Sequence, residues 1–263
     1  MAYHESNTQR VKKFFKNPRE NACKIIPFLK SKVTPLQRDV VEFIGIEKYS
    51  KPYSGHAKLL KYINKKGGFF VQCGGNDGFF QDPTYYLEKF RGWRGIIVEP
   101  LPISRLCQRN RKNSTVIKSA CVSFSYRKAT ISFVDCNAMS FVKGSIENSS
   151  KQIKGGEESQ KIKCREIIVP SQTIQSIIDR EKTKIDMGDI DLFVADVEGY
   201  ELAILQGLNF SKNSPKFILL EIQTQKRLKE IEEFLDNHNY FMVDHIIEKD
   251  YLFTKKQNHE SFH

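Results

Sequence analysis

Short apolar runs alternate with amphipathic segments along the chain from Gly67 onward. The runs are rich in β-branched and aromatic residues and read FFVQC (69–73), GIIVE (95–99), TVIKSACV (115–122), IDLFVAD (190–196), FILLEI (217–222) and YFMVDHIIEKDYLFTK (240–255). Runs of this kind, separated by segments with helical spacing, predict buried strands of a parallel sheet covered by helices. We therefore expect an α/β fold over residues 67–258, with a mostly parallel sheet and helices on both of its faces.

Two regions have a different pattern. Residues 1–66 contain lysine-rich segments with helical spacing, such as Leu36, Val40 and Phe43, interrupted by prolines, and predict a small helical N-terminal extension. Within the main domain, the alternating segments ATISFVD and KIKCREIIV predict two inserted strands at about 129–170, and the polar stretch ENSSKQIKGGEESQK between them predicts a loop. That loop is either a lid on the substrate side of a site or an ordinary solvent loop.

The composition fits a chain with a large core. Of its 263 residues 40% are hydrophobic. No run approaches the roughly 18 to 20 apolar residues that a membrane span needs, and the N-terminus MAYHESNTQRVKKFF is too polar for a secretory signal. These features predict the absence of a membrane span and a cytoplasmic location.

Cysteines and charges narrow the class of partner. The six cysteines form no C-x-x-C pair, so we expect free thiols, with neither a zinc site nor a compact disulfide framework. The cysteines are Cys23, Cys73, Cys107, Cys121, Cys136 and Cys164.

The net charge of +11 could serve a polyanion, a membrane surface or an anionic substrate. However, the basic residues are spread along the chain and do not alternate with aromatic residues, which disfavours a nucleic-acid partner.

The first apolar run ends in a glycine-rich turn, GGNDG, at residues 74–78. Glycine allows positive φ and lets a ligand approach the main chain without a Cβ in the way, although tight strand-to-helix turns also use Gly and Asn for conformational reasons alone. Glu99 ends the next run, 21 residues after Gly78. In a doubly wound fold a carboxylate there can accept hydrogen bonds from both hydroxyls of a ribose, whereas the alternative is an ordinary solvent-facing Glu. Because the turn and the carboxylate occur in order at adjacent strand ends, we favour a ribose-containing cofactor.

The composition of the turn decides between two types of cofactor. A dinucleotide requires a G-x-G-x-x-G turn that brings a helix N-terminus against its pyrophosphate, and Asp77 would repel the phosphates. S-adenosylmethionine has no phosphate, and an acidic residue such as Asp77 can help hold its ammonium group. The turn therefore predicts methyl transfer and not hydride transfer.

Several ordered motifs reach beyond the turn. They are GGFFVQCGGNDGFFQDPTYYLEKFRGWRGIIVEPLP (67–102), SACVS (119–123), IDLFVADVEGYELAILQGL (190–208) and FILLEI (217–222). In these motifs the sequence resembles the FkbM-type S-adenosylmethionine-dependent methyltransferases, and the resemblance covers most of residues 67–255. It implies a Rossmann-like class I methyltransferase fold and O-methylation of a sugar or another secondary-metabolite hydroxyl. One departure is Gln72, which stands where family members usually carry an acidic residue.

The resemblance also implies roles for individual residues. The turn would line the methionine end of the cofactor, Glu99 would hold the ribose, and Ser119 with Ala120 would lie near the adenine. The complete predicted cofactor site consists of Gly74, Gly75, Asn76, Asp77, Gly78, Glu99, Pro100, Ser119, Ala120 and Asp196.

Candidate catalytic residues follow a later strand. The segment ADVEGYE places Asp196 and Glu198 at the sheet edge where open α/β folds bind ligands. Removing a proton from an alcohol requires a general base, a divalent metal ion or both, so we predict that both carboxylates are catalytic; the alternative for Glu198 is a capping role at the following helix. Asp196, Glu221 and Gln223 would offer hard oxygen ligands to Mg²⁺ or Mn²⁺. His245 is a third candidate base, although a lone histidine in a strand usually packs or faces solvent.

Together these features predict an S-adenosylmethionine-dependent O-methyltransferase. Its acceptor would be a hydroxyl of a sugar, glycan or related metabolite, free or linked to a nucleotide or a lipid. Two alternatives stay open, namely a non-catalytic binding protein that keeps the fold and an RNA methyltransferase. The sequence defines neither the acceptor nor the oligomeric state.

Overall fold

The computed structural model describes residues 53–146, 148–185 and 187–256, and these residues belong to one compact unit, Pro52–His263. Most of the predicted N-terminal extension, residues 1–52, lies outside the described residues; the described remainder contains helix α4 (His56–Leu59). Within the described ranges, no helix combines the length and apolar character that a bilayer crossing requires.

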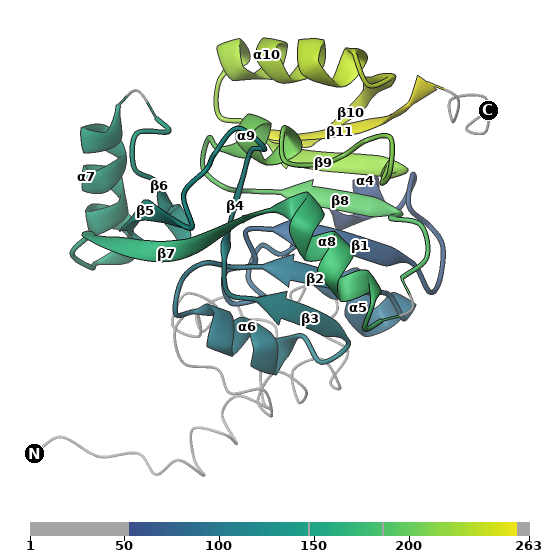
Figure 1. Ribbon diagram of the computed structural model, residues 1–263, viewed down its shortest axis with the longest axis horizontal. Coiled ribbons are helices and arrows are strands. Elements are labelled where there is room, and N and C mark those ends of the chain that lie inside the picture. Colours follow the sequence, from purple (N-terminus) through teal and green to yellow (C-terminus); the bar gives the residue numbers. More distant parts are fainter. Residues whose placement is uncertain (1–52, 147, 186, 257–263) are drawn as a thin grey trace, which may run out of the picture. The chain divides into compact units, whose positions relative to one another are not determined.

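A seven-stranded sheet forms the centre of this unit (Figure 1). In spatial order its strands are β10 (Tyr240–Ile247), β11 (Asp250–Lys255), β9 (Phe217–Glu221), β8 (Leu192–Ala195), β1 (Phe69–Cys73), β2 (Arg94–Val98) and β3 (Ser114–Ile117). The strands from β9 to β3 run parallel, and β10 and β11 form an antiparallel hairpin that pairs with β9. The predicted α/β fold with a mostly parallel sheet is confirmed.

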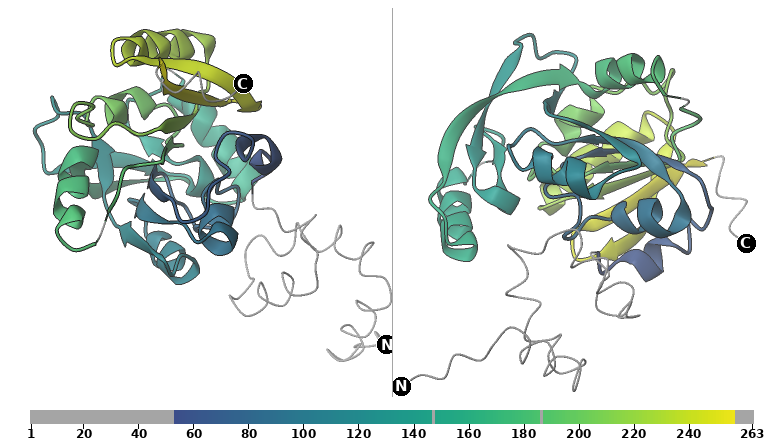
Figure 2. Two further views of the ribbon diagram at one scale, coloured as in Figure 1. Left: turned by 90° about the vertical axis from the view of Figure 1, so that its right-hand side faces the viewer. Right: turned by 90° about the horizontal axis from the view of Figure 1, so that it is seen from below.

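Helices cover both faces of this sheet. Successive residues of a strand point to opposite faces, and the apolar residues on each face pack against helices. Phe69 and Val71 of β1 pack into the core on one face, and Phe70 packs into the core on the other. The helices on the first face are α8 (Ile174–Lys182), α9 (Glu201–Leu205) and α10 (Gln225–Asp236), and those on the second are α4, α5 (Tyr85–Arg91) and α6 (Ser104–Asn110). The left view of Figure 2 shows helices on either side of the sheet.

Between β3 and α8 the chain builds a second sheet, which we call the insert together with the elements that join its strands. In order, its strands are β4 (Ala120–Val122), β7 (Arg165–Thr173), β5 (Thr130–Asp135) and β6 (Phe141–Val142). Strands β5 and β7 are the two that the alternating segments predict. The apolar run 115–122 is divided between β3 and β4, because the chain turns at Lys118 and Ser119 and β4 pairs with β7 instead of continuing in the central sheet.

The insert also contains two helical segments, η1 (Asn137–Met139) and α7 (Ser149–Gln160). The prediction of a loop for the polar stretch that includes Ser149–Gln160 is therefore wrong. Ile153 packs against a small apolar cluster of Val134, Cys136 and Phe141, and this tertiary packing overrides the weak helix propensity of serine and glycine. Figure 1 shows α7 beside β5 and β6, away from the central sheet.

The expectation of free thiols is wrong for two cysteines. Cys136 and Cys164 form a disulfide, whereas Cys73, Cys107 and Cys121 are free and buried. The bond follows from the antiparallel pairing of β5 with β7, in which Asp135 lies opposite Arg165. Cys136, which follows Asp135, therefore faces Cys164, which precedes Arg165. Spacing along the sequence carries no sign of this pairing.

Candidate functional site

A pocket opens at the carboxyl ends of β1, β2 and β8, the edge at which open α/β sheets bind ligands. It has a volume of about 970 Å³, including space that is open to solvent. Its walls come from the loops after β1, β2 and β8 and from the insert, including the start of β4. The predicted site residues that line it are Gly74, Gly75, Asn76, Glu99, Pro100, Ser119, Ala120, Asp196 and Glu198. The structure thus brings most of the predicted site together.

The turn after β1 is shaped by close contacts within the protein. Gly74 has a φ of +85°, and a Cβ on it would lie 1.9 Å from the carbonyl oxygen of Asp196. A Cβ on Gly75 would lie 2.3 Å from Cγ2 of Ile97. Both glycines are therefore required for the end of β1 to pack against its neighbours. As a consequence the main chain of the turn forms part of the pocket wall.

Asp77 and Gly78 make contacts within the turn and behind it. Oδ1 of Asp77 accepts hydrogen bonds from the amides of Phe79 and Phe80, both at 2.8 Å. A Cβ on Gly78 would lie 2.8 Å from Sγ of Cys107. Among the described residues that line the pocket, neither Asp77 nor Gly78 is included, and their predicted contact with the methionine end stays a prediction.

Glu99 is buried at the pocket wall, where each of its oxygens meets a main-chain N–H. Oε2 accepts a hydrogen bond from the amide of Asn76 at 2.8 Å, and Oε1 accepts one from the amide of Leu101 at 2.9 Å. These bonds join the turn after β1 to the loop after β2. Burial raises the pKa of Glu99 to about 7, against the opposing effect of the backbone hydrogen bonds. Each carboxylate oxygen keeps a second lone pair that can accept a hydrogen bond from a ribose hydroxyl.

Ser119 lies where the chain leaves the central sheet for the insert. Its Oγ donates a hydrogen bond to the carbonyl oxygen of Pro170 at 3.2 Å and accepts one from Nε2 of Gln172 at 3.3 Å. The side chain is fully buried. Strand β7 thereby fixes Ser119 and Ala120 at the pocket wall.

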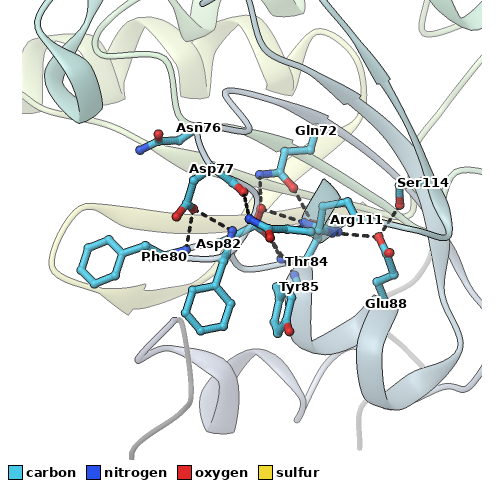
Figure 3. Close-up of polar contacts among 12 residues, drawn as sticks. Gln72, Asn76, Asp77, Phe80, Asp82, Thr84, Tyr85, Glu88, Arg111 and Ser114 are labelled. Atoms are coloured by element: carbon cyan, nitrogen blue, oxygen red, sulfur yellow. Dashed lines mark hydrogen bonds and ion pairs between the residues drawn. The ribbon is translucent and has the colours of Figure 1, made fainter. Parts of the chain in front are cut away.

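Gln72, the departure from the family pattern, belongs to a buried polar network (Figure 3). Its Nε2 donates to Oδ2 of Asp82 at 3.2 Å and to the carbonyl oxygen of Gly74 at 3.1 Å. Arg111, which is completely buried, lies 2.7 Å from the Asp82 carboxylate and 2.8 Å from that of Glu88. Asp82 also lines the pocket. Gln72 itself carries no charge, and Asp82 therefore provides a carboxylate beside the end of β1.

The sequence-based predictions do not include Asp82. Its Oδ1 accepts hydrogen bonds from the amides of Thr84 and Tyr85 at 2.8 and 2.9 Å, at the start of α5. The signal in the sequence is the pair Asp82-Pro83 in front of the helix, because Asp near a helix N-cap and Pro in the first turn are typical of a helix start.

Three carboxylates meet at the ends of β8 and β9. Asp196, Glu198 and Glu221 each place one oxygen within 4.8 Å of an oxygen of the other two. Although Asp196 is open to the pocket, its removal from bulk water and the repulsion from Glu221 raise its pKa well above the usual range. Burial, followed by repulsion from Glu221, raises the pKa of Glu198 to about 7. Because this repulsion requires an ionised neighbour, the cluster keeps a net negative charge while part of it stays protonated near neutral pH, and it can accept a proton from a bound hydroxyl group.

Glu201, which is also absent from the predictions, holds the loop that carries Glu198. Its Oε1 accepts hydrogen bonds from the amides of Gly199 at 2.9 Å and Val197 at 3.4 Å. In this loop Glu198 has a φ of +52°, which is uncommon for a residue other than glycine. Glu201, at the first position of α9, thus fixes the loop that carries Glu198, and the spacing E-G-x-E at a helix start is its signal.

The predicted metal ligands are brought together only in part. Asp196 and Glu221 approach each other, with Glu198 as the third carboxylate. Gln223 donates from Nε2 to Glu198 at 3.3 Å, and its Oε1, the atom that would bind a cation, accepts a hydrogen bond from Nζ of Lys249. Binding of Mg²⁺ or Mn²⁺ stays a prediction.

His245 lies on β10 in the hairpin at the edge of the sheet. Its ring stacks on that of Tyr251 with 4.7 Å between centroids, and its Nε2 contacts the carbonyl oxygen of Glu248. In the described part of the chain His245 is not among the residues that line the pocket. Its role as a base stays a prediction.

The model of one protein family, the methyltransferase FkbM domain, matches residues 72–242, which is more than half of the chain. The chain belongs to the FkbM methyltransferase family. It is accordingly an S-adenosylmethionine-dependent methyltransferase, and its fold is the Rossmann-like fold of the class I methyltransferases, as the resemblance implies. A comparison with curated proteins finds no match.

Solved structures of three methyltransferases are similar in fold to this chain. Precorrin-6y C5,15-methyltransferase from Geobacter metallireducens GS-15 is 13% identical over 76% of this chain and 86% of its own, with a TM-score of 0.41. An S-adenosylmethionine-dependent methyltransferase from Aquifex aeolicus is 11% identical over 84% of this chain and 96% of its own, with a TM-score of 0.39. A methyltransferase from Thiobacillus denitrificans in complex with S-adenosyl-L-homocysteine is 9% identical over 81% of this chain and 73% of its own, with a TM-score of 0.33.

The residues of the pocket fit the cofactor of the FkbM family. The bare main chain at Gly74 and Gly75 leaves the wall open, and the carboxylate of Glu99 lies at the same wall, as the prediction of a ribose contact requires. The cluster of Asp196, Glu198 and Glu221 gives this edge a negative charge that attracts a cationic sulfonium and an ammonium group.

Proposed function

We propose that this methyltransferase transfers the methyl group of S-adenosylmethionine to a hydroxyl of a sugar, glycan or related metabolite. The observation that carries the proposal is the cluster of Asp196, Glu198 and Glu221 at the pocket. An alcohol is a weak nucleophile until its proton is accepted by a neighbouring group. Glu198, whose pKa is raised to about 7, is suited to that task, and the carboxylates of the cluster also accept hydrogen bonds from the remaining hydroxyls of a polyol.

In this proposal each part of the site has one role. S-adenosylmethionine supplies an electrophilic methyl group when bound. The turn at 74–76 and Glu99 hold the cofactor, while Phe133 and Tyr200, which line the pocket, exclude water from it. Asp196 or Glu198 accepts the proton of the hydroxyl as its oxygen attacks in line, and most of the rate enhancement comes from holding the reactants at near-attack distance.

A bound Mg²⁺ or Mn²⁺ is the alternative means of activating the hydroxyl. Asp196, Glu198 and Glu221 would then be its ligands, and the ion would lower the pKa of a hydroxyl bound to it. The two versions are distinguished by dialysis against EDTA. Activity that survives EDTA identifies a carboxylate base, and activity that is lost and then restored by Mg²⁺ or Mn²⁺ identifies the metal.

The acidic pocket bears on the two alternatives to a sugar acceptor. Phosphate groups close to Asp196 and Glu198 would be repelled, which argues against RNA and favours an acceptor whose reactive end is uncharged. RNA methylation would also require an affinity for RNA that falls steeply with salt. A non-catalytic binding protein would transfer no methyl group, and the absence of S-adenosylhomocysteine binding in calorimetry would favour it.

The test is methyl transfer from S-adenosylmethionine with a tritium-labelled methyl group to a panel of neutral mono- and oligosaccharides. We expect label in at least one sugar and a loss of at least 100-fold in rate for Asp196→Asn. Asp189→Asn is the control, because the Asp189 side chain is 85% exposed and lies outside the pocket lining; its rate should stay within twofold of wild type. Protein that binds S-adenosylhomocysteine in calorimetry but labels no sugar would contradict the sugar acceptor.

A further inference from the structure

The bond between Cys136 and Cys164 fastens one segment of the insert. Cys136 directly precedes η1, and Cys164 directly precedes β7. The bond closes a loop with a sequence separation of 28 residues, which contains η1, β6 and α7 (Figure 1). We call the described residues of 136–164 the clamped segment.

Helix α7 depends on this bond for its packing. A helix of 12 residues is marginal in isolation, and α7 contains Gly155 and Gly156, although glycine is a weak helix former. Within the described residues, no side chain caps its N-terminus. A Cβ on Gly156 would lie 3.0 Å from Cβ of Cys136 and 3.5 Å from Sγ of Cys164. The helix therefore rests directly on the disulfide, with glycine at the contact.

Further contacts of α7 are made with the residues that the bond holds in place. Oε1 of Glu157 accepts a hydrogen bond from the amide of Cys164 at 3.1 Å. Ser159 donates from Oγ to Sδ of Met139, in η1, at 3.3 Å. Opening the disulfide would therefore weaken the support of α7 on two sides.

The clamped segment reaches the pocket at several points. The lining residues that it contributes are Asn137, Ala138, Ser140 and Val142. Nε2 of Gln152, on α7, donates a hydrogen bond to Oε2 of Glu198 at 3.1 Å. Ile146 lies against the same loop, since a Cβ on Gly199 would be 3.0 Å from its Cγ2. By contrast, the turn at 74–76 and Glu99 belong to the central sheet.

We propose that the clamped segment is the acceptor-binding wall of the pocket and that the Cys136–Cys164 disulfide is its redox-sensitive fastening. The proposal rests on the proposed function. In the disulfide form, Gln152 positions Glu198 and residues 137–140 face the acceptor, a neutral molecule with several hydroxyls. The residues predicted to hold the cofactor lie outside the clamped segment, so cofactor binding is independent of the bond.

The redox step is a thiol–disulfide exchange. Reduction breaks the S–S bond, adds two electrons and two protons and yields two thiols, and a dithiol such as dithiothreitol supplies them and becomes a cyclic disulfide. Disulfides in the cytosol are usually transient and redox-sensing. At the cytoplasmic location that the sequence predicts, the bond would therefore couple acceptor binding to the thiol state of the cell.

Hydrogen exchange of the full chain, measured by mass spectrometry, tests the fastening. Oxidised protein is compared with protein reduced by dithiothreitol and with the double variant Cys136→Ser/Cys164→Ser. We expect exchange in 149–164 to be at least tenfold faster in the latter two, while β1 and β8 keep their protection and the affinity for S-adenosylhomocysteine changes less than twofold. Dithiothreitol should have no further effect on the double variant, which controls for the free thiols. Unchanged exchange in α7, or cofactor affinity lost in parallel, would overturn the proposal.

Initial rates with the sugar panel test the acceptor wall. Reduction and Gln152→Ala should each raise the KM for the sugar at least tenfold and the KM for S-adenosylmethionine less than twofold. Lys229→Ala, at an exposed position on α10 outside the clamped segment, should match wild type. Equal changes in both KM values would overturn the assignment. If the oxidised protein methylates no sugar, the proposed function fails, and the acceptor assignment fails with it. The hydrogen-exchange data would still decide whether the disulfide fastens the clamped segment.

Discussion

The guanidinium group of Arg111 lies 2.7 Å from the carboxylate of Asp82, and neither side chain is more than 2% exposed. Glu88 adds a second buried carboxylate at 2.8 Å, so one cation serves two anions. The pair joins the residue after α6 to the start of α5, next to the turn that forms the pocket wall. The position of that turn therefore depends on a buried charge network (Figure 3).

Replacing Arg111 with leucine should lower the free energy of unfolding by about 3–5 kcal/mol, because Asp82 and Glu88 would stay buried without a counter-charge. Urea unfolding at pH 7 measures the loss. Arg165→Ala is the matched control, since Arg165 pairs with Asp135 while 67% exposed, and exposed pairs contribute about 0–1 kcal/mol. Similar losses for the two variants would show that the buried network stabilises the protein no more than an exposed ion pair does.

Glu99→Gln should weaken binding of S-adenosylhomocysteine by about 10- to 100-fold, because hydrogen bonds to a charged group contribute roughly 1.5–3 kcal/mol. Isothermal titration calorimetry gives the affinity. Glu166→Gln is the control, since Glu166 forms an exposed ion pair with Lys143, and it should bind as wild type does. Unaltered affinity in Glu99→Gln would remove Glu99 from the ribose site.

The pH dependence of the same binding follows from the burial of Glu99, which raises its pKa to about 7. The ionised carboxylate is the better acceptor for ribose hydroxyls, so wild-type affinity should increase as pH rises from 6 to 8. Glu99→Gln has no charge to gain at this position and should lose that increase. A wild-type affinity that falls over this range would contradict the assignment.

The fold and the edge of the sheet at which the pocket opens were predictable because their signals are local. Continuous apolar runs such as 69–73 and 217–222 mark buried strands, and Glu99 follows the glycine turn at a regular distance. The remaining features depend on contacts between distant residues. Arg111 lies 29 residues from Asp82, and the partner of Cys136 is set by the register of β5 on β7. Neither relationship leaves a periodic pattern in the sequence.

Glu201 should make the stability of the protein decrease with rising pH. Burial raises its pKa from 4.5 to about 7, so between these values the folded state binds more protons than the unfolded state, and stability falls as pH rises through the window. Glu201→Gln keeps an oxygen for the amides of Val197 and Gly199. The free energy of unfolding is measured with urea at pH 5 and at pH 8. Its decrease from pH 5 to pH 8 should be smaller by about 1–3 kcal/mol in the variant than in wild type. Identical losses would mean that Glu201 is ionised throughout.

Gly74→Ala should destabilise the protein far more than the same change at Gly92. Both glycines have positive φ, +85° and +68°, so both variants incur the cost of a left-handed alanine, about 1–2 kcal/mol. Only at Gly74 would the new Cβ also lie 1.9 Å from the main-chain oxygen of Asp196; around the Cβ position of Gly92, no described atom lies within 4 Å. Moving β1 away from β8 would shift Asp196 at the pocket. We therefore expect Gly74→Ala to lose at least about 3 kcal/mol in urea unfolding and to bind S-adenosylhomocysteine at least tenfold more weakly, with cofactor affinity unchanged in Gly92→Ala. Equal stability of the two variants would mean that the ends of β1 and β8 are not packed as closely as the structure has them.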